Sequence, residues 1–82
     1  GLAVAGTLVI SGAEERAVED SRGLLTAHGS DYAAATLLDG LLVVRYLGNS
    51  TERARRLFTD VWTMLRQQTI GQQASMPRIW AT

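Results

Sequence analysis

The pattern of hydrophobic and polar residues divides the chain into segments, and the pattern within each segment predicts a strand or a helix. Residues 2–10 form a short, continuous apolar run, which is typical of a strand buried on both of its faces. A helix is expected next, ending near His28, because Gly29 supplies a natural left-handed stop. Ser11 and Glu14 have the spacing of a capping box and predict the start of this helix.

The second half of the chain predicts a hairpin followed by an amphipathic helix. Asp39-Gly40 separates two apolar runs, residues 32–38 and 41–47, and this dipeptide favours a two-residue type I′ turn. The order β-α-β-β-α, followed by an extended tail over residues 72–82, predicts an α+β fold. Behind Gly48, apolar residues recur at the spacing of the buried face of a helix: Ala54, Leu57, Phe58, Val61, Trp62 and Leu65.

Length and composition limit the classes of protein to which the chain can belong. Eighty-two residues allow one small domain. Eight acidic and eight basic side chains cancel, so the chain lacks the charge of one sign that a nucleic-acid-binding domain carries. Its apolar start is shorter than the roughly 18 residues of a membrane span. We therefore expect no nucleic-acid partner and no membrane anchor, and the absence of cysteine favours a reducing compartment.

No combination of side chains predicts an enzyme active site within the segment. The single histidine, His28, excludes a cage built from several histidine or cysteine ligands, and the sequence contains neither a phosphate-binding loop nor a serine-nucleophile motif. At the end of its helix, His28 is expected to be a capping or half-buried residue. The alternative is a nickel ligand shared with residues outside the segment. We expect no catalytic residue, no cofactor and no metal site here.

Arginine and tryptophan supply the candidate contact residues, because both are enriched at binding hot spots. Arg45 interrupts an apolar strand, so its guanidinium must pair inside the protein or contact a partner. Trp62 fits the buried face of its helix, and Arg66 lies one turn further along. Arg78 and Trp80 stand on the tail, where they either dock against the body of the protein or contact a partner.

Several segments match one family in the same order along the chain. The match is weakest over residues 13–31, and the closing Pro-Arg-Ile-Trp-x-Thr is its most specific element. The segments are 6–9, 40–48, 54–58, 61–62, 65–66, 70–72 and 77–82. Together they resemble the C-terminal part of the UreD (UreH) family of urease accessory proteins. Because the chain opens on Gly1 with an apolar strand and is much shorter than that family, we expect residues 1–82 to be the C-terminal segment of a single domain whose N-terminal part is absent.

The resemblance implies a non-catalytic maturation factor in the cytoplasm. Members of the family bind apo-urease and the accessory protein UreF, and UreF recruits the GTPase UreG. The assembled complex, rather than this segment, handles the nickel that enters the urease active site. The family fold is largely β with added helices. The rival interpretation is a small α+β regulatory module that folds by itself and binds a metabolite between a strand and a helix.

Overall fold

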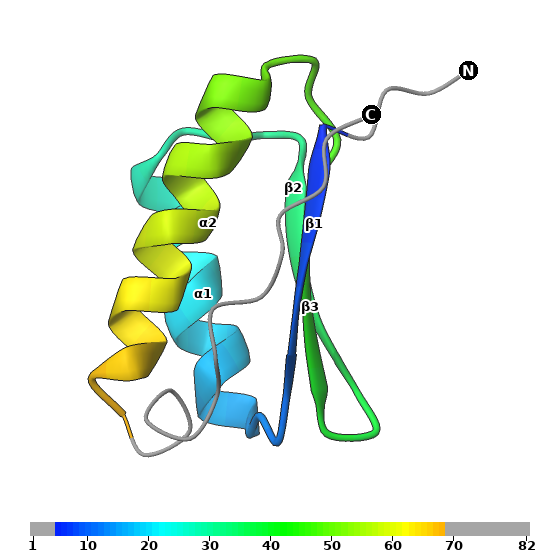
Figure 1. The fold of residues 1–82 in the computed structure, drawn as a ribbon, viewed down its shortest axis with the longest axis vertical. Helices are drawn as coiled ribbons and strands as arrows, with labels where there is room; N and C mark the ends of the chain where they lie inside the picture. Colours follow the sequence, from blue (N-terminus) through cyan, green and yellow to red (C-terminus); the bar gives the residue numbers. More distant parts are fainter. Residues whose placement is uncertain (1–4, 69–82) are drawn as a thin grey trace.

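A computed structural model describes residues 5–68, in which two helices pack against one face of a three-stranded sheet (Figure 1). The order of elements confirms the predicted α+β fold. The tail predicted over residues 72–82 lies outside the described residues. The elements are β1 (Gly6–Ser11), α1 (Glu15–Ala27), β2 (Ala33–Leu38), β3 (Leu41–Tyr46) and α2 (Thr51–Arg66).

The sheet has the strand order β1-β3-β2, and β3 is antiparallel to both neighbours. β1 and β2 therefore run parallel to each other with β3 between them, and α1 connects them. In the register of the sheet, Val44 of β3 lies between Leu8 of β1 and Ala35 of β2. Helix α1 packs mainly on β2, whereas α2 packs on β1 and on α1. Both helices consequently cover the same face of the sheet.

The two predicted glycine-dependent turns are present. Asp39 and Gly40 have φ angles of 50° and 75°, and a type I′ turn requires positive φ at both central residues. Gly29 has a φ of 68° directly after the C-cap residue of α1, His28, which confirms the predicted stop of this helix. These positions fix the register of β2 on β3 and the exit of the chain from α1.

The predicted capping box at the start of α1 is wrong. Ser11 is the last residue of β1 and pairs with Leu41, so its backbone belongs to the sheet. Gly12 then turns the chain with a φ of 76°, and Glu14 becomes the N-cap without a side-chain capping bond. The pairing of β1 with β3 includes Ser11, one residue beyond the predicted end of the strand, because hydrogen bonding in the sheet competes with the local capping signal.

The prediction that the first strand is buried on both faces is also wrong for the described residues. Burial alternates along β1, so that Leu8 and Ile10 face the helices whereas Val9 faces away from them. The reason is that α1 and α2 lie on one side of the sheet only. A continuous apolar sequence has thus folded into a strand with one open face.

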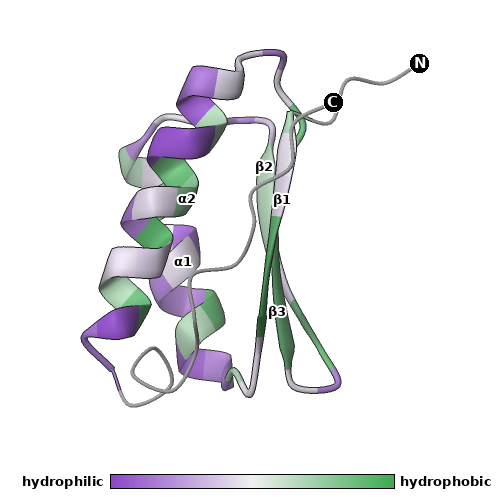
Figure 2. Ribbon diagram, in the orientation of Figure 1, coloured by the Kyte–Doolittle hydropathy of each residue, from purple (hydrophilic) through white to green (hydrophobic). Residues whose placement is uncertain are grey.

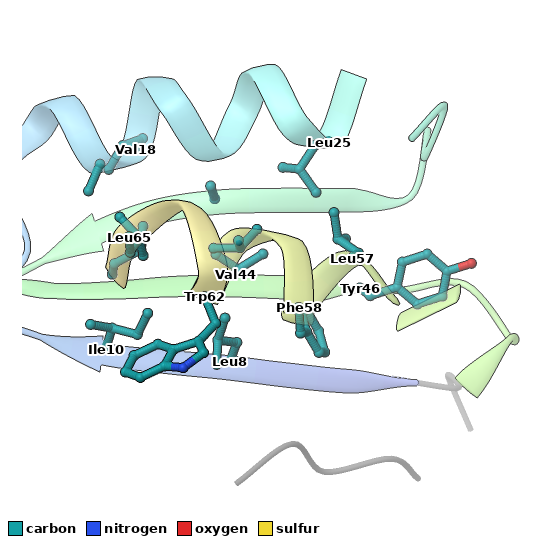
Figure 3. Close-up of a cluster of buried hydrophobic side chains, with 14 of the residues drawn as sticks. Leu8, Ile10, Val18, Leu25, Val44, Tyr46, Leu57, Phe58, Trp62 and Leu65 are labelled. Carbon is teal, nitrogen blue, oxygen red and sulfur yellow. The ribbon is translucent and has the colours of Figure 1, made fainter. Parts of the chain in front are cut away.

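The core lies between the helix-facing side of the sheet and the two helices (Figure 3). Figure 2 shows hydrophobic colouring along β1 and β3 toward the end that leads to the β2–β3 hairpin. Burial of apolar surface here is the main term that holds the helices on the sheet. All six residues of the predicted stripe on α2 are buried: Ala54, Leu57, Phe58, Val61, Trp62 and Leu65.

The buried face of α1 contains one polar side chain, Ser21. It is fully buried, and its hydroxyl has no hydrogen-bond partner among residues 5–68. A buried hydroxyl without a partner costs about 1–3 kcal/mol. We therefore expect Ser21→Ala to raise the free energy of unfolding by about 1 kcal/mol, measured by urea denaturation. Thr26→Ala on the exposed side of α1 is the control for helix propensity, and a destabilised Ser21→Ala variant would contradict the prediction.

Candidate functional site

The side of the sheet that faces away from the helices is the main candidate surface, and we call it the open face. Side chains alternate between the two sides of a strand, so the residues of the open face follow from the register. They form three rows across β1, β3 and β2: Thr7, Arg45 and Ala34; Val9, Val43 and Thr36; and Ser11, Leu41 and Leu38.

The open face is apolar at the end near the β2–β3 hairpin. Val9, Leu41 and Leu38 are 37%, 40% and 59% exposed, and they are three of the five large hydrophobic residues exposed in the described part of the chain. Val43 of β3 pairs with Val9 in the middle row and is half-buried. Scattered apolar residues are normal on a surface, but a contiguous group on one sheet face indicates an interaction surface.

Arg45 lies in the row at the opposite end of the open face. It is exposed, and its neighbours across the sheet are Thr7 and Ala34. Within residues 5–68 its guanidinium makes neither an ion pair nor a hydrogen bond. The internal carboxylate that the sequence analysis left open as one alternative is therefore not supplied by this part of the chain.

The other predicted contact residues occupy different places. Trp62 is 3% exposed and lies beside Leu8 and Ile10 of β1 (Figure 3), so its ring is part of the core. Arg66 is exposed in the last turn of α2, where a cation interacts favourably with the helix dipole. The structure does not bring Trp62 and Arg45 together, because they lie on opposite sides of the sheet.

Arg78 and Trp80, the two candidates of the tail, lie outside the described residues. Their roles in docking or partner contact stay predictions from the sequence.

His28 takes part in a contact that sequence analysis missed. Its Nε2 lies 2.7 Å from Oδ2 of Asp60, which ties the end of α1 to α2. Toward the other end of the helix pair, Nε2 of Gln68 donates to Oδ2 of Asp20 at 2.9 Å. Local patterns could not identify either partner, since each pair is far apart in sequence and meets only when the two helices pack.

The geometry around His28 is that of a structural residue. Only 20% of its side chain is exposed, as expected for a half-buried position at a helix end. In the described ranges of the chain, no three histidine, cysteine or carboxylate side chains gather to hold a metal ion. The contact between His28 and Asp60 therefore contributes to the packing of α1 on α2.

A cleft of about 510 Å³ lies between the C-terminal half of α1 and β2, at an edge of the sheet. Arg22 and Thr26 line it from the helix, and Ala33 and Ala35 line it from the helix-facing side of the strand. The lining combines small and hydroxyl-bearing side chains with few charges, and it contains no paired base and nucleophile. Its chemistry suits contact with another surface better than catalysis.

Neither helix of the described part is long and apolar enough to cross a membrane.

Comparison with known proteins supports the same assignment as the sequence motifs. The model of the family described as UreD urease accessory protein matches residues 1–81. A UreD urease accessory protein of Dechloromonas aromatica is 39% identical over all of this chain, and one of Nitrosococcus oceani is 40% identical over all of it. A third, from Citrobacter koseri, is 39% identical over 94% of the chain.

The chain spans less than a third of these relatives: 30% of the first, 27% of the second and 27% of the third. The resemblance found in the sequence motifs is thus confirmed. Because the family model matches residues 1–81 of 82, the chain belongs to the UreD urease accessory protein family.

Proposed function

We propose that the chain is the C-terminal segment of a urease maturation factor. In this role it belongs to a non-catalytic scaffold that binds apo-urease and other accessory proteins while nickel is inserted into the urease active site. The observation that carries the proposal is the family match over residues 1–81. The relatives named as UreD urease accessory proteins, which align with all or nearly all of the chain, support it.

The proposed partners are apo-urease and UreF, with UreG recruited through UreF, in the cytoplasm. Nickel is then the cargo of the assembled complex. The described residues include a surface that is suited to protein contact, because the outer side of α2 presents exposed arginines such as Arg55 and Arg66. If the assembled complex carries the nickel, this segment needs surfaces that bind its protein partners and needs no catalytic residues.

The nickel content of urease tests this function directly. Urease is purified from cells that carry the full urease operon, with the parent gene of this chain either intact or deleted. We expect nickel-poor, inactive urease after the deletion and normal loading when the gene is restored on a plasmid. Normal nickel content in the deletion strain, with urease present at the same level, would overturn the proposal.

The tail residues are tested by a double replacement, Arg78→Ala with Trp80→Ala, in the full-length protein. If they contact a partner, we expect less urease and UreF to co-purify while thermal stability stays unchanged. If they dock against the body of the protein, the folded yield falls instead. Gln73→Ala with Ser75→Ala, at two polar positions of the same tail, is the matched control. Wild-type behaviour of the double variant in both assays would remove the tail from the proposal.

The rival function, a module that binds a metabolite, has one specific place in the structure, the cleft between α1 and β2. It predicts that a small ligand raises the melting temperature of the protein, since binding to the folded state alone stabilises it. The family match favours maturation over this alternative. Screening metabolites by thermal shift separates the two functions, because a scaffold for protein partners gives no such shift.

A further inference from the structure

We propose that the open face is buried in the full-length protein, and that the part of the polypeptide that precedes this segment packs on it as a covering layer. This inference rests on the proposed position of the chain at the C-terminal end of a UreD-family protein. It assigns the apolar rows of the sheet to internal packing, and it leaves the outer sides of α1 and α2 for partners.

The amino-acid pattern of the strands requires a cover on both faces of the sheet. Strands of an antiparallel sheet with one wet face alternate apolar and polar residues. β1 instead continues as Leu8, Val9 and Ile10, and β3 begins with four apolar residues in succession. The helices cover four of these seven side chains: Leu8, Ile10, Leu42 and Val44. The other three lie on the open face and have the composition of a surface that another layer buries.

The length of the relatives identifies the occupant. Since the chain matches only 27–30% of three curated relatives, most of a UreD-family polypeptide lies outside it. A domain of two or three layers buries each apolar sheet face against another element of the same core. The incoming chain reaches the sheet at Gly6, beside the row of Thr7 and Arg45.

Arg45 determines which groups the covering layer must present. Its guanidinium has no ion-pair partner in the described part of the chain, and it stands in the row next to the apolar middle row of the open face. When a layer covers that face, an arginine at its rim must be paired with a carboxylate or with backbone carbonyls. We therefore expect the covering segment to present such acceptors opposite Arg45 and apolar side chains opposite Val9 and Leu41.

Site-specific photo-crosslinking in the full-length protein tests the inference. A photoreactive phenylalanine derivative replaces Leu41 on the open face or, as the control, Thr63 on the exposed side of α2. After irradiation, mass spectrometry is expected to find crosslinks from position 41 to residues that precede this segment in the same polypeptide, and none of these from position 63. Crosslinks from position 41 to a second copy, to urease or to UreF would overturn the inference.

Footprinting of the unmodified full-length protein covers the case in which the derivative prevents folding. Hydroxyl radicals should label Leu38 and Leu41 several-fold more slowly than Leu47, because Leu47 has similar exposure in this segment but lies outside the open face. Equal labelling rates would overturn the inference. Neither experiment depends on nickel, so the two proposals fail separately. A protected open face together with normal nickel loading in the deletion strain would refute the proposed function and leave the inferred cover of the open face intact. An open face that is labelled as fast as Leu47, together with nickel-poor urease in the deletion strain, would refute the cover and leave the proposed function intact.

Discussion

Replacing Trp62 by alanine is expected to lower the free energy of unfolding by about 3–5 kcal/mol, the range for removing a large aromatic side chain from a core. The ring is 3% exposed and lies beside Leu8 and Ile10 of β1, so its removal leaves a cavity where α2 meets the sheet. Because small domains are stable by about 5–15 kcal/mol in total, the variant is expected to lose a large share of its stability. Urea denaturation followed by circular dichroism measures the change.

Two controls separate this core role from a role in partner contact. Thr63→Ala changes the next residue, which is exposed on α2, and is expected to alter stability by less than about 1 kcal/mol. Trp62→Phe keeps an aromatic ring in the core and is expected to retain the fold with a smaller loss of stability than Trp62→Ala. If Trp62→Ala were as stable as the wild type but bound urease less well, the ring would be a contact residue and the core assignment would be wrong.

Much of the fold follows from local sequence signals. The stripe on α2 steps at helical spacing, and every residue of it is buried. Asp39-Gly40 specifies the type I′ turn through two positive φ angles, and Gly29 marks the end of α1 in the same way. These features need only a few neighbouring residues, so they are visible without knowledge of the tertiary structure.

The features that sequence analysis missed depend on contacts between distant segments. Ser11 has the spacing of a helix cap, yet its pairing with Leu41 places it in the sheet. The same holds for His28, whose partner Asp60 is set by the way α1 and α2 pack. The sequence could not reveal that both helices lie on one face, and this arrangement alone makes Val9 exposed rather than buried.

The sequence predicts the environment of some candidate contact residues and not of others. Residue type alone does not distinguish a core residue from a contact residue, but the helical spacing of α2 predicts that Trp62 is buried. Burial places Trp62 in the core, and the register of the sheet places Arg45 on the open face. The apolar part of that face went unnoticed because its residues, among them Val9 and Leu41, look like ordinary members of a strand buried on both sides.

Leu42 and Leu41 provide a matched pair for testing which face of the sheet is covered. They are adjacent residues of the same type in β3, but Leu42 is 0% exposed on the helix-facing side, whereas Leu41 is 40% exposed on the open face. Leu42→Ala is expected to cost about 2–5 kcal/mol, through lost burial and a residual cavity. Leu41→Ala should cost about 1 kcal/mol or less in the 82-residue chain, because its side chain is already partly in water.

The comparison becomes most informative when the same two replacements are made in the full-length polypeptide. Leu42→Ala should cost about as much there as in the 82-residue chain, since its surroundings are the two helices in both cases. The cost of Leu41→Ala should rise toward that of Leu42→Ala if a second layer buries the open face, because its side chain then leaves a cavity too. Equal, small costs of Leu41→Ala in both lengths of chain would instead mean that the open face stays in contact with water.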